Sequence, residues 1–147
     1  MEKCLQLYSL MRECLRKIEW LAPLLARFTI GVVFIESGWG KLHNLEKVID
    51  FFQSLGIPAA QYQAPFVAGV ELVAGTLILV GLATRLASIP LIGTMIVAII
   101  TAKKDDISGW TDLFGISEFL YVVLLIWILL AGPGKASIDE QIKKRTI

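Results

Sequence analysis

Ionizable side chains inside long apolar segments are the residues of this sequence most able to do chemistry. Placing a charged side chain at the centre of a membrane helix costs about 2.5–3.5 kcal/mol on insertion scales. Each such residue is therefore expected to have a structural or functional role. Four such groups lie within apolar segments, and one lysine lies just beyond the first segment. We predict these five as substrate-binding candidates of a polar site: Arg27, Glu36, Glu71, Glu118 and Lys41.

Spacing places some of these groups on two helix faces that can pack together. One face has residues that step by four, three, four and three positions: Arg27, Gly31, Phe34, Gly38 and Lys41. The other steps by four, three and four: Ala64, Ala68, Glu71 and Gly75. Small residues allow helix backbones to approach closely in a membrane. We therefore predict that the two faces are in contact and that Arg27 and Glu71 form an ion pair near the midplane.

Three interpretations of the Arg27–Glu71 pair remain open at this stage. It is a structural clamp that sets the helix register, a site for a quinone, lipid or small anion, or part of a proton path. Glu36 lies half a turn from Arg27 and is expected on another face. Glu118 is expected near the membrane interface, reaching for water, and His43 is expected to be solvated.

Several kinds of chemistry lack the residues they need. The single histidine, His43, cannot provide bis-histidine ligation of haem, and Cys4 and Cys14 cannot hold an iron–sulfur cluster. Both cysteines lie in the charged N-terminal segment, which excludes a disulfide relay on the opposite side. No zinc-protease, serine-hydrolase or phosphate-loop motif is found. We predict no catalytic residue, no metal site and no intrinsic cofactor, so a redox centre would belong to a partner.

Composition indicates which elements position these residues. Apolar residues make up 56% of the 147 residues, charged residues 18%, and the mean hydropathy is +0.70. A helix crosses a bilayer with about 20 apolar residues and satisfies its backbone amides without water. We therefore predict an all-α fold, a bundle of four transmembrane helices. The predicted spans are 21–37, 59–84, 86–102 and 113–131, and Trp20 marks the interface before the first span.

Two further segments have the helical periodicity of amphipathic helices. Residues 3–19 are predicted to lie on the membrane face. Residues 44–58 form a shorter helix between the first two spans, with Asn44 as its cap and Gly56 at its end. Its polar residues are expected in water: Glu46, Lys47, Asp50 and Gln53.

The predicted domain organisation has three parts. Residues 1–19 form the interfacial helix, 20–134 the transmembrane domain, and 135–147 a cytoplasmic tail in which Ser137 and Glu140 form a capping box. Nine basic residues flank the spans on the side of both termini: Lys3, Arg12, Arg16, Lys17, Arg85, Lys135, Lys143, Lys144 and Arg145. Four lie on the other side: Lys41, Lys47, Lys103 and Lys104. The positive-inside rule therefore predicts that both termini are cytoplasmic.

Five short motifs resemble one family of membrane proteins. They are R-x3-G-x2-F-x3-G-x2-K (27–41), G-I-P (56–58), G-V-E-L (69–72), G-L-A-T-R (81–85) and G-P-G-K-A-S-I-D (132–139). From Arg27 to Asp139 the chain is similar to the DoxX family of small four-helix membrane proteins, whereas residues 1–19 lie outside the family pattern. The family takes its name from a subunit of a thiosulfate:quinone oxidoreductase. The resemblance implies a role in redox complexes of the bacterial inner membrane.

The leading hypothesis is a non-catalytic membrane subunit with an intramembrane polar pocket that supports a quinone-linked redox partner. Quinone or lipid is the candidate ligand. The main alternative is an assembly factor or cargo-binding protein without a redox role, because the wider superfamily includes such proteins. A small transporter is disfavoured, since four short unbroken helices leave little room for alternating access without oligomerisation. The expected partners are the lipid bilayer, a redox enzyme subunit and further copies of the chain, and no nucleic acid.

Overall fold

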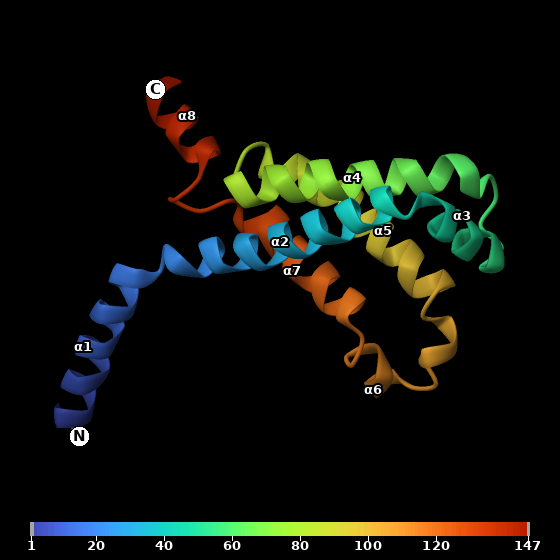
Figure 1. The fold of residues 1–147 in the computed structure, drawn as a ribbon. Coiled ribbons are helices and arrows are strands. Elements are labelled where there is room, and N and C mark those ends of the chain that lie inside the picture. Colours follow the sequence, from blue (N-terminus) through green and yellow to red (C-terminus); the bar gives the residue numbers. More distant parts are fainter. Residues whose placement is uncertain (1, 147) are drawn as a thin grey trace.

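The protein is all-helical over the part of the chain that the structure describes. The structure is a computed structural model that describes the backbone of residues 2–146 and the side chains of residues 7–145, so Cys4 lies outside the described side chains. Figure 1 shows the arrangement of the helices. The elements are α1 (Glu2–Ile18), α2 (Leu21–His43), α3 (Leu45–Ser54), α4 (Ala60–Val80), α5 (Thr84–Thr101), the 3-10 helix η1 (Lys104–Asp106), α6 (Trp110–Leu113), α7 (Ser117–Ala131) and α8 (Ile138–Thr146).

Three helices are long and apolar enough to cross a membrane. They are α2, α4 and α5, with 23, 21 and 18 residues. The fourth predicted span is shorter than expected, because the chain between α6 and α7 leaves the helical conformation. Ile116 has an extended backbone (φ −87°, ψ 137°), so α7 begins only at Ser117. Its 15 residues rise about 22 Å, less than the thickness of a typical hydrocarbon core.

The apolar helices form two antiparallel pairs, α2 with α4 and α5 with α7. We call the end that holds both termini and the α4–α5 turn the terminal end, and the end that holds α3 and α6 the cap end. Figure 1 shows that the α5–α7 pair diverges from the α2–α4 pair toward the cap end.

Glycines allow α2 and α4 to pack with their backbones almost in contact. A Cβ atom at Gly38 would lie 2.6 Å from the backbone nitrogen of Leu72, and one at Gly75 would lie 2.9 Å from the Cβ of Phe34. A Cβ at Gly31 would lie 2.6 Å from that of Leu79. These contacts confirm the prediction that the two faces with small residues pack together.

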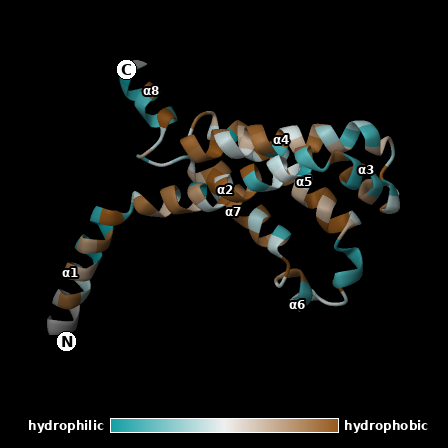
Figure 2. Ribbon diagram, viewed as in Figure 1, coloured by the Kyte–Doolittle hydropathy of each residue, from teal (hydrophilic) through white to brown (hydrophobic). Residues whose placement is uncertain are grey.

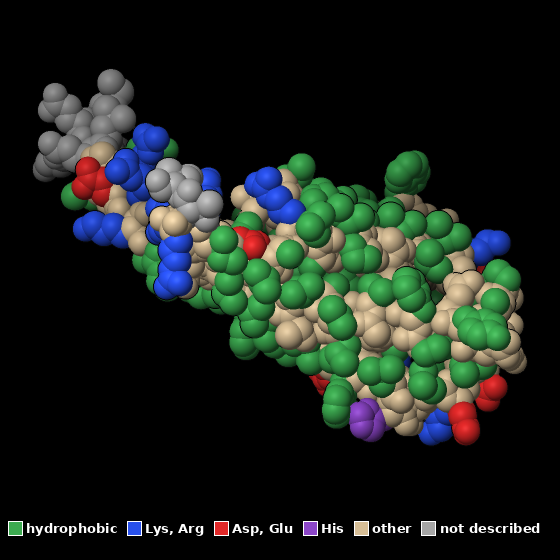
Figure 3. Space-filling model, turned by 90° about the horizontal axis from the view of Figure 1, so that it is seen from above, with side chains coloured by type: hydrophobic (Ala, Val, Ile, Leu, Met, Phe, Trp, Pro, Cys, Tyr) green, Lys and Arg blue, Asp and Glu red, His purple; other side chains and the backbone are tan. Residues whose placement is uncertain are grey.

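The buried core lies toward the terminal end, where the helix pairs converge. Its fully buried members come from all four apolar helices: Ile30, Phe34, Ile78, Leu91, Leu125 and Ile128. Many other large apolar side chains are exposed on the outer surface of the helices. Figures 2 and 3 show that polar and charged residues gather at the ends and that hydrophobic residues cover the surface between them. This distribution is typical of a protein whose solvent is lipid.

The two amphipathic segments are helical, as predicted. Figure 1 shows α1 projecting from the terminal end across the direction of the bundle. Its location on a membrane surface stays a prediction. In α3 the apolar residues are half-buried, except Phe51, and the predicted polar residues Glu46, Lys47, Asp50 and Gln53 are exposed. Asn44 does not cap α3; its Nδ2 instead donates to the carbonyl of Gly40 at 3.0 Å, which supports the end of α2.

Candidate functional site

A cavity of about 580 Å³ lies at the cap end, lined by residues of α2, α3, α4, α5 and α7. Most of its walls are apolar; α3 contributes Phe51 and Phe52, and Leu55 follows the end of that helix. Polar side chains are few. Those that line it are Ser37, Lys41, Gln63, Glu71, Thr94, Thr101, Lys103, Glu118 and Tyr121. A mostly apolar concave site with a few convergent polar groups is the usual form of a small-molecule site.

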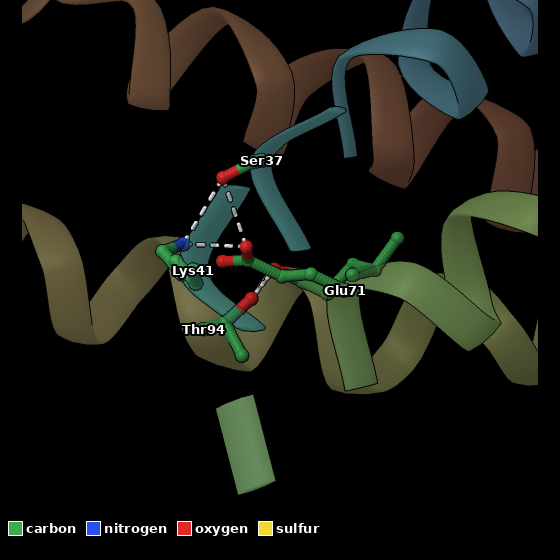
Figure 4. A network of polar contacts seen from close by, with 5 residues as sticks. Ser37, Lys41, Glu71 and Thr94 are labelled. Atoms are coloured by element: carbon green, nitrogen blue, oxygen red, sulfur yellow. Dashed lines mark hydrogen bonds and ion pairs between the residues drawn. The ribbon is translucent and has the colours of Figure 1, made fainter. Parts of the chain in front are cut away.

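Glu71 is the most deeply buried charged group of this cavity, with 1% of its side chain exposed. Its Oε2 accepts a hydrogen bond from Ser37 Oγ at 2.9 Å and forms an ion pair with Lys41 Nζ. Lys41 Nζ also donates to Ser37 Oγ at 3.1 Å, so the three side chains form a closed triangle (Figure 4). The ion pair and the hydrogen bond together offset the cost of burying the carboxylate.

The local sequence explains why this triangle forms. Ser37 and Lys41 are four residues apart, so they lie on the same face of α2. Gly38, between them, lets α4 approach closely enough for Glu71 to reach both. An ammonium group has three N–H donors, and the described contacts of Lys41 use two of them. Because Lys41 lines the cavity and is 27% exposed, its third donor is available to a ligand.

Arg27 does not pair with Glu71, so that prediction is wrong. The guanidinium of Arg27 instead donates to four backbone carbonyls: those of Ile78 (2.9 Å), Leu79 (2.9 Å), Pro133 (3.0 Å) and Ala136 (2.7 Å). The antiparallel register of α2 and α4 is the reason. It places Ser37 opposite Glu71 and Arg27 opposite the end of α4, about 15 Å further along the helix axis.

Arg27 therefore joins α2 to the C-terminal end of α4 and to the segment after α7. At Gly81, whose φ of +77° suits glycine, a Cβ would lie 2.6 Å from Arg27 Nη2. Asp139 completes this cluster by accepting hydrogen bonds from the backbone nitrogens of Ala83 (2.8 Å) and Thr84 (3.1 Å), which caps α5. Arg27 thus holds these segments together through backbone carbonyls. The clamp interpretation concerned an Arg27–Glu71 pair, which does not form.

The predicted capping box of Ser137 and Glu140 also lies at the terminal end. Ser137 Oγ accepts a hydrogen bond from the backbone nitrogen of Glu140 at 3.2 Å, which confirms the serine half of the box. The sequence motif 132–139 contained both Ser137 and Asp139, although it did not indicate their contacts.

The cavity gathers three of the five candidate residues and leaves two outside. Lys41, Glu71 and Glu118 line it, whereas Arg27 and the exposed Glu36 do not. Glu118 is half-buried and accepts a hydrogen bond from Ser117 Oγ at 3.1 Å. His43 is exposed, as expected, and is the last residue of α2.

Four residues with hydroxyl groups line the cavity and were not among the predicted site residues: Ser37, Thr94, Thr101 and Tyr121. Ser37 bonds both charged partners, and Thr94 Oγ1 donates to the carbonyl of Leu91 at 2.9 Å (Figure 4). Serine and threonine are common in membrane helices, where they bond their own backbone, so their type alone indicates little. The position of Ser37 four residues before Lys41 was the available signal.

Comparison with known proteins identifies the family. Residues 22–104 match the sequence profile of the DoxX family, which covers more than half of the chain. The chain belongs to the DoxX family. This stretch of the DoxX-family protein includes Lys41 and Glu71, whereas Glu118 and the 132–139 motif lie beyond it.

Three curated relatives support the assignment of this DoxX-family protein. A Bacillus subtilis protein named "Putative oxidoreductase CatD" is 37% identical over 114 residues, which cover 78% of this chain and 80% of that protein. The uncharacterized membrane protein Rv3486 of Mycobacterium tuberculosis is 33% identical, covering 81% and 80% of the two chains. The inner membrane protein YqjF of Escherichia coli is 24% identical, covering 89% and 99%. No solved structure matches the chain. The protein is an integral membrane protein of this family.

Proposed function

We propose that this DoxX-family protein is a non-catalytic membrane subunit that binds a quinone in the cap-end cavity and supports a redox partner. The observation that carries the proposal is the Lys41–Glu71–Ser37 triangle within a cavity whose walls are mostly apolar. A quinone has the matching chemistry, because its ring is lipophilic and its carbonyl oxygens accept hydrogen bonds. Lys41 lines the cavity and has a third N–H donor that can bond such a carbonyl oxygen.

The charges around the cavity favour a neutral ligand over an anionic one. Its charged lining residues are two lysines and two glutamates, so their formal charges cancel: Lys41, Lys103, Glu71 and Glu118. Lys41 is already neutralised by Glu71, and Lys103 is paired with Asp106 at 3.3 Å. A phosphate or carboxylate headgroup would lose its hydration without gaining a free counter-charge. The carbonyl oxygen of a quinone, in contrast, needs only a hydrogen-bond donor and no counter-charge.

In this proposal the chain binds and orients the quinone, and electrons come from the partner. The printed name of the Bacillus subtilis relative, an oxidoreductase, supports the redox role. The Escherichia coli relative, an inner membrane protein, supports location in a bacterial inner membrane. The excess of basic residues at the terminal end supports cytoplasmic termini.

Titration of the purified protein with a short-chain ubiquinone analogue tests the proposal. We expect saturable binding, measured by quenching of tryptophan fluorescence. Replacing both charged partners, Lys41→Met with Glu71→Leu, removes the donor without leaving a charge unpaired. Because a hydrogen bond to a charged group contributes about 1.5–3 kcal/mol, the double variant should bind at least about tenfold more weakly.

Glu36→Gln is the matched control, since Glu36 is exposed on the same helix and does not line the cavity. Its affinity should equal that of the wild type. Equal affinity of the double variant, or no saturable binding by the wild type, would contradict the proposal. Copurification from native membranes with a folding client and no redox enzyme would favour the assembly-factor alternative.

A further inference from the structure

We infer that the tail of the quinone lies in a groove between α4 and α5 on the lipid-facing surface. The groove has a volume of about 680 Å³, and all of its lining side chains are apolar. They are Pro65, Phe66, Gly69, Val70, Val73, Ala74, Leu77, Ala83, Leu86, Ala87 and Pro90. This inference rests on the proposed function, because it assigns a second part of the same ligand.

The groove continues directly from the polar cavity. Phe66, Val70 and Pro90 line both spaces, so a ligand can leave the cavity along this seam without crossing a helix. Phe66, at the junction, is 70% exposed. The cavity therefore opens laterally, toward lipid, where a hydrophobic ligand is found.

Two glycines keep this path open. A Cβ atom at Gly69, on the groove, or at Gly93, on the cavity, would meet no atom within 4 Å. These glycines thus differ from Gly38 and Gly75, whose missing side chains allow helix contact. Larger side chains at Gly69 or Gly93 would fill space that is otherwise available to a ligand.

The shape of the groove fits one long chain. Along α4 it extends from Pro65 to Leu77, which corresponds to about 18 Å, more than half of a hydrocarbon core of about 30 Å. Its lining has no polar group that could hold a second headgroup. The polar head therefore lies at the cap end, and a single tail runs from it toward the terminal end.

A photoreactive quinone with a diazirine at the far end of a long tail tests the inference. The wild-type protein in nanodiscs is irradiated with this probe, and labelled peptides are identified by mass spectrometry. We expect labels on α4 between residues 65 and 77 and on α5 between residues 83 and 90. Gly69→Leu should strongly reduce these labels while leaving the affinity for the short-chain analogue unchanged.

Gly40→Leu is the matched control, because Gly40 also has open space around it but lines neither the cavity nor the groove. It should leave the labelling pattern unchanged. Labels spread evenly over all lipid-facing helices, or a pattern that Gly69→Leu does not alter, would overturn the tail assignment even if the short analogue binds. Failure of the short analogue to bind would instead overturn the proposed function. Labelling that an excess of the same long-tailed quinone without the diazirine does not reduce would identify the groove as a general lipid site and overturn the quinone assignment.

Discussion

The Lys41–Glu71 ion pair should dominate the response of stability to mutation at the cap end. Glu71 is 1% exposed, so Lys41→Met leaves a buried carboxylate without its counter-charge and should cost about 3–5 kcal/mol. Lys41 is 27% exposed and can turn toward water, so Glu71→Leu should cost less, about 1–3 kcal/mol.

The double variant Lys41→Met with Glu71→Leu should lie within about 1 kcal/mol of the wild type, because no charge is left unpaired. Ser37 loses both partners, yet its hydroxyl can rotate to a carbonyl of its own helix. The free energy of unfolding is measured in mixed micelles by titration with sodium dodecyl sulfate and followed by circular dichroism. The double variant should therefore be more stable than the Lys41→Met variant.

Arg27→Met with Glu71→Leu is the control for this cycle. Arg27 and Glu71 share no hydrogen bond in the structure, so their costs should add. The reasoning is refuted if Lys41→Met and Glu71→Leu are additive to within about 0.5 kcal/mol. If Arg27→Met instead restored the stability lost in Glu71→Leu, the result would indicate that Arg27 and Glu71 interact, contrary to the structure.

Three further predictions concern Arg27, the helix contact and the orientation. Arg27→Met should lower the free energy of unfolding by at least about 3 kcal/mol in the same assay, because four carbonyls lose a charged donor; a loss below about 1 kcal/mol would reject this structural role of Arg27. Gly38→Leu should cost more than about 3 kcal/mol, since its Cβ would meet the backbone of α4, whereas Gly40→Leu should be nearly neutral; equal costs would reject the contact. A cysteine at Lys47 should react with an impermeant thiol reagent in intact bacteria and one at Lys144 should not; the opposite pattern would reverse the orientation.

Much of the fold could be predicted because its determinants are local. Hydropathy located the apolar helices, and the spacing of Gly31, Gly38 and Gly75 predicted which faces of α2 and α4 would be in contact. The helical periodicity of polar and apolar residues likewise predicted the solvent-exposed and half-buried faces of α3. These properties depend on side chains within a few turns of one helix, so periodicity is enough to reveal them.

The candidate site was predicted only in part. The sequence analysis selected Lys41, Glu71 and Glu118 because placing a charged side chain in or near a membrane costs free energy. It did not recognise Lys41 as the partner of Glu71. Both Arg27 and Lys41 share a helix face, and either could meet a carboxylate on α4. Spacing along one helix does not determine the axial offset between two helices, so the partner could not be chosen.

The tertiary structure decided the register, and with it the chemistry of each charged residue. Close glycine contacts between α2 and α4 place Ser37 opposite Glu71 and leave Arg27 beside the carbonyls at the end of α4. The cavity likewise is lined by residues of α2, α3, α4, α5 and α7, so no single segment determines it. The sequence by itself determined where the main apolar and amphipathic helices lie and which faces of α2, α3 and α4 they present, but not where α7 begins. Their axial offsets and crossing angles depend on how side chains from different helices interlock, so only the packed structure decided them.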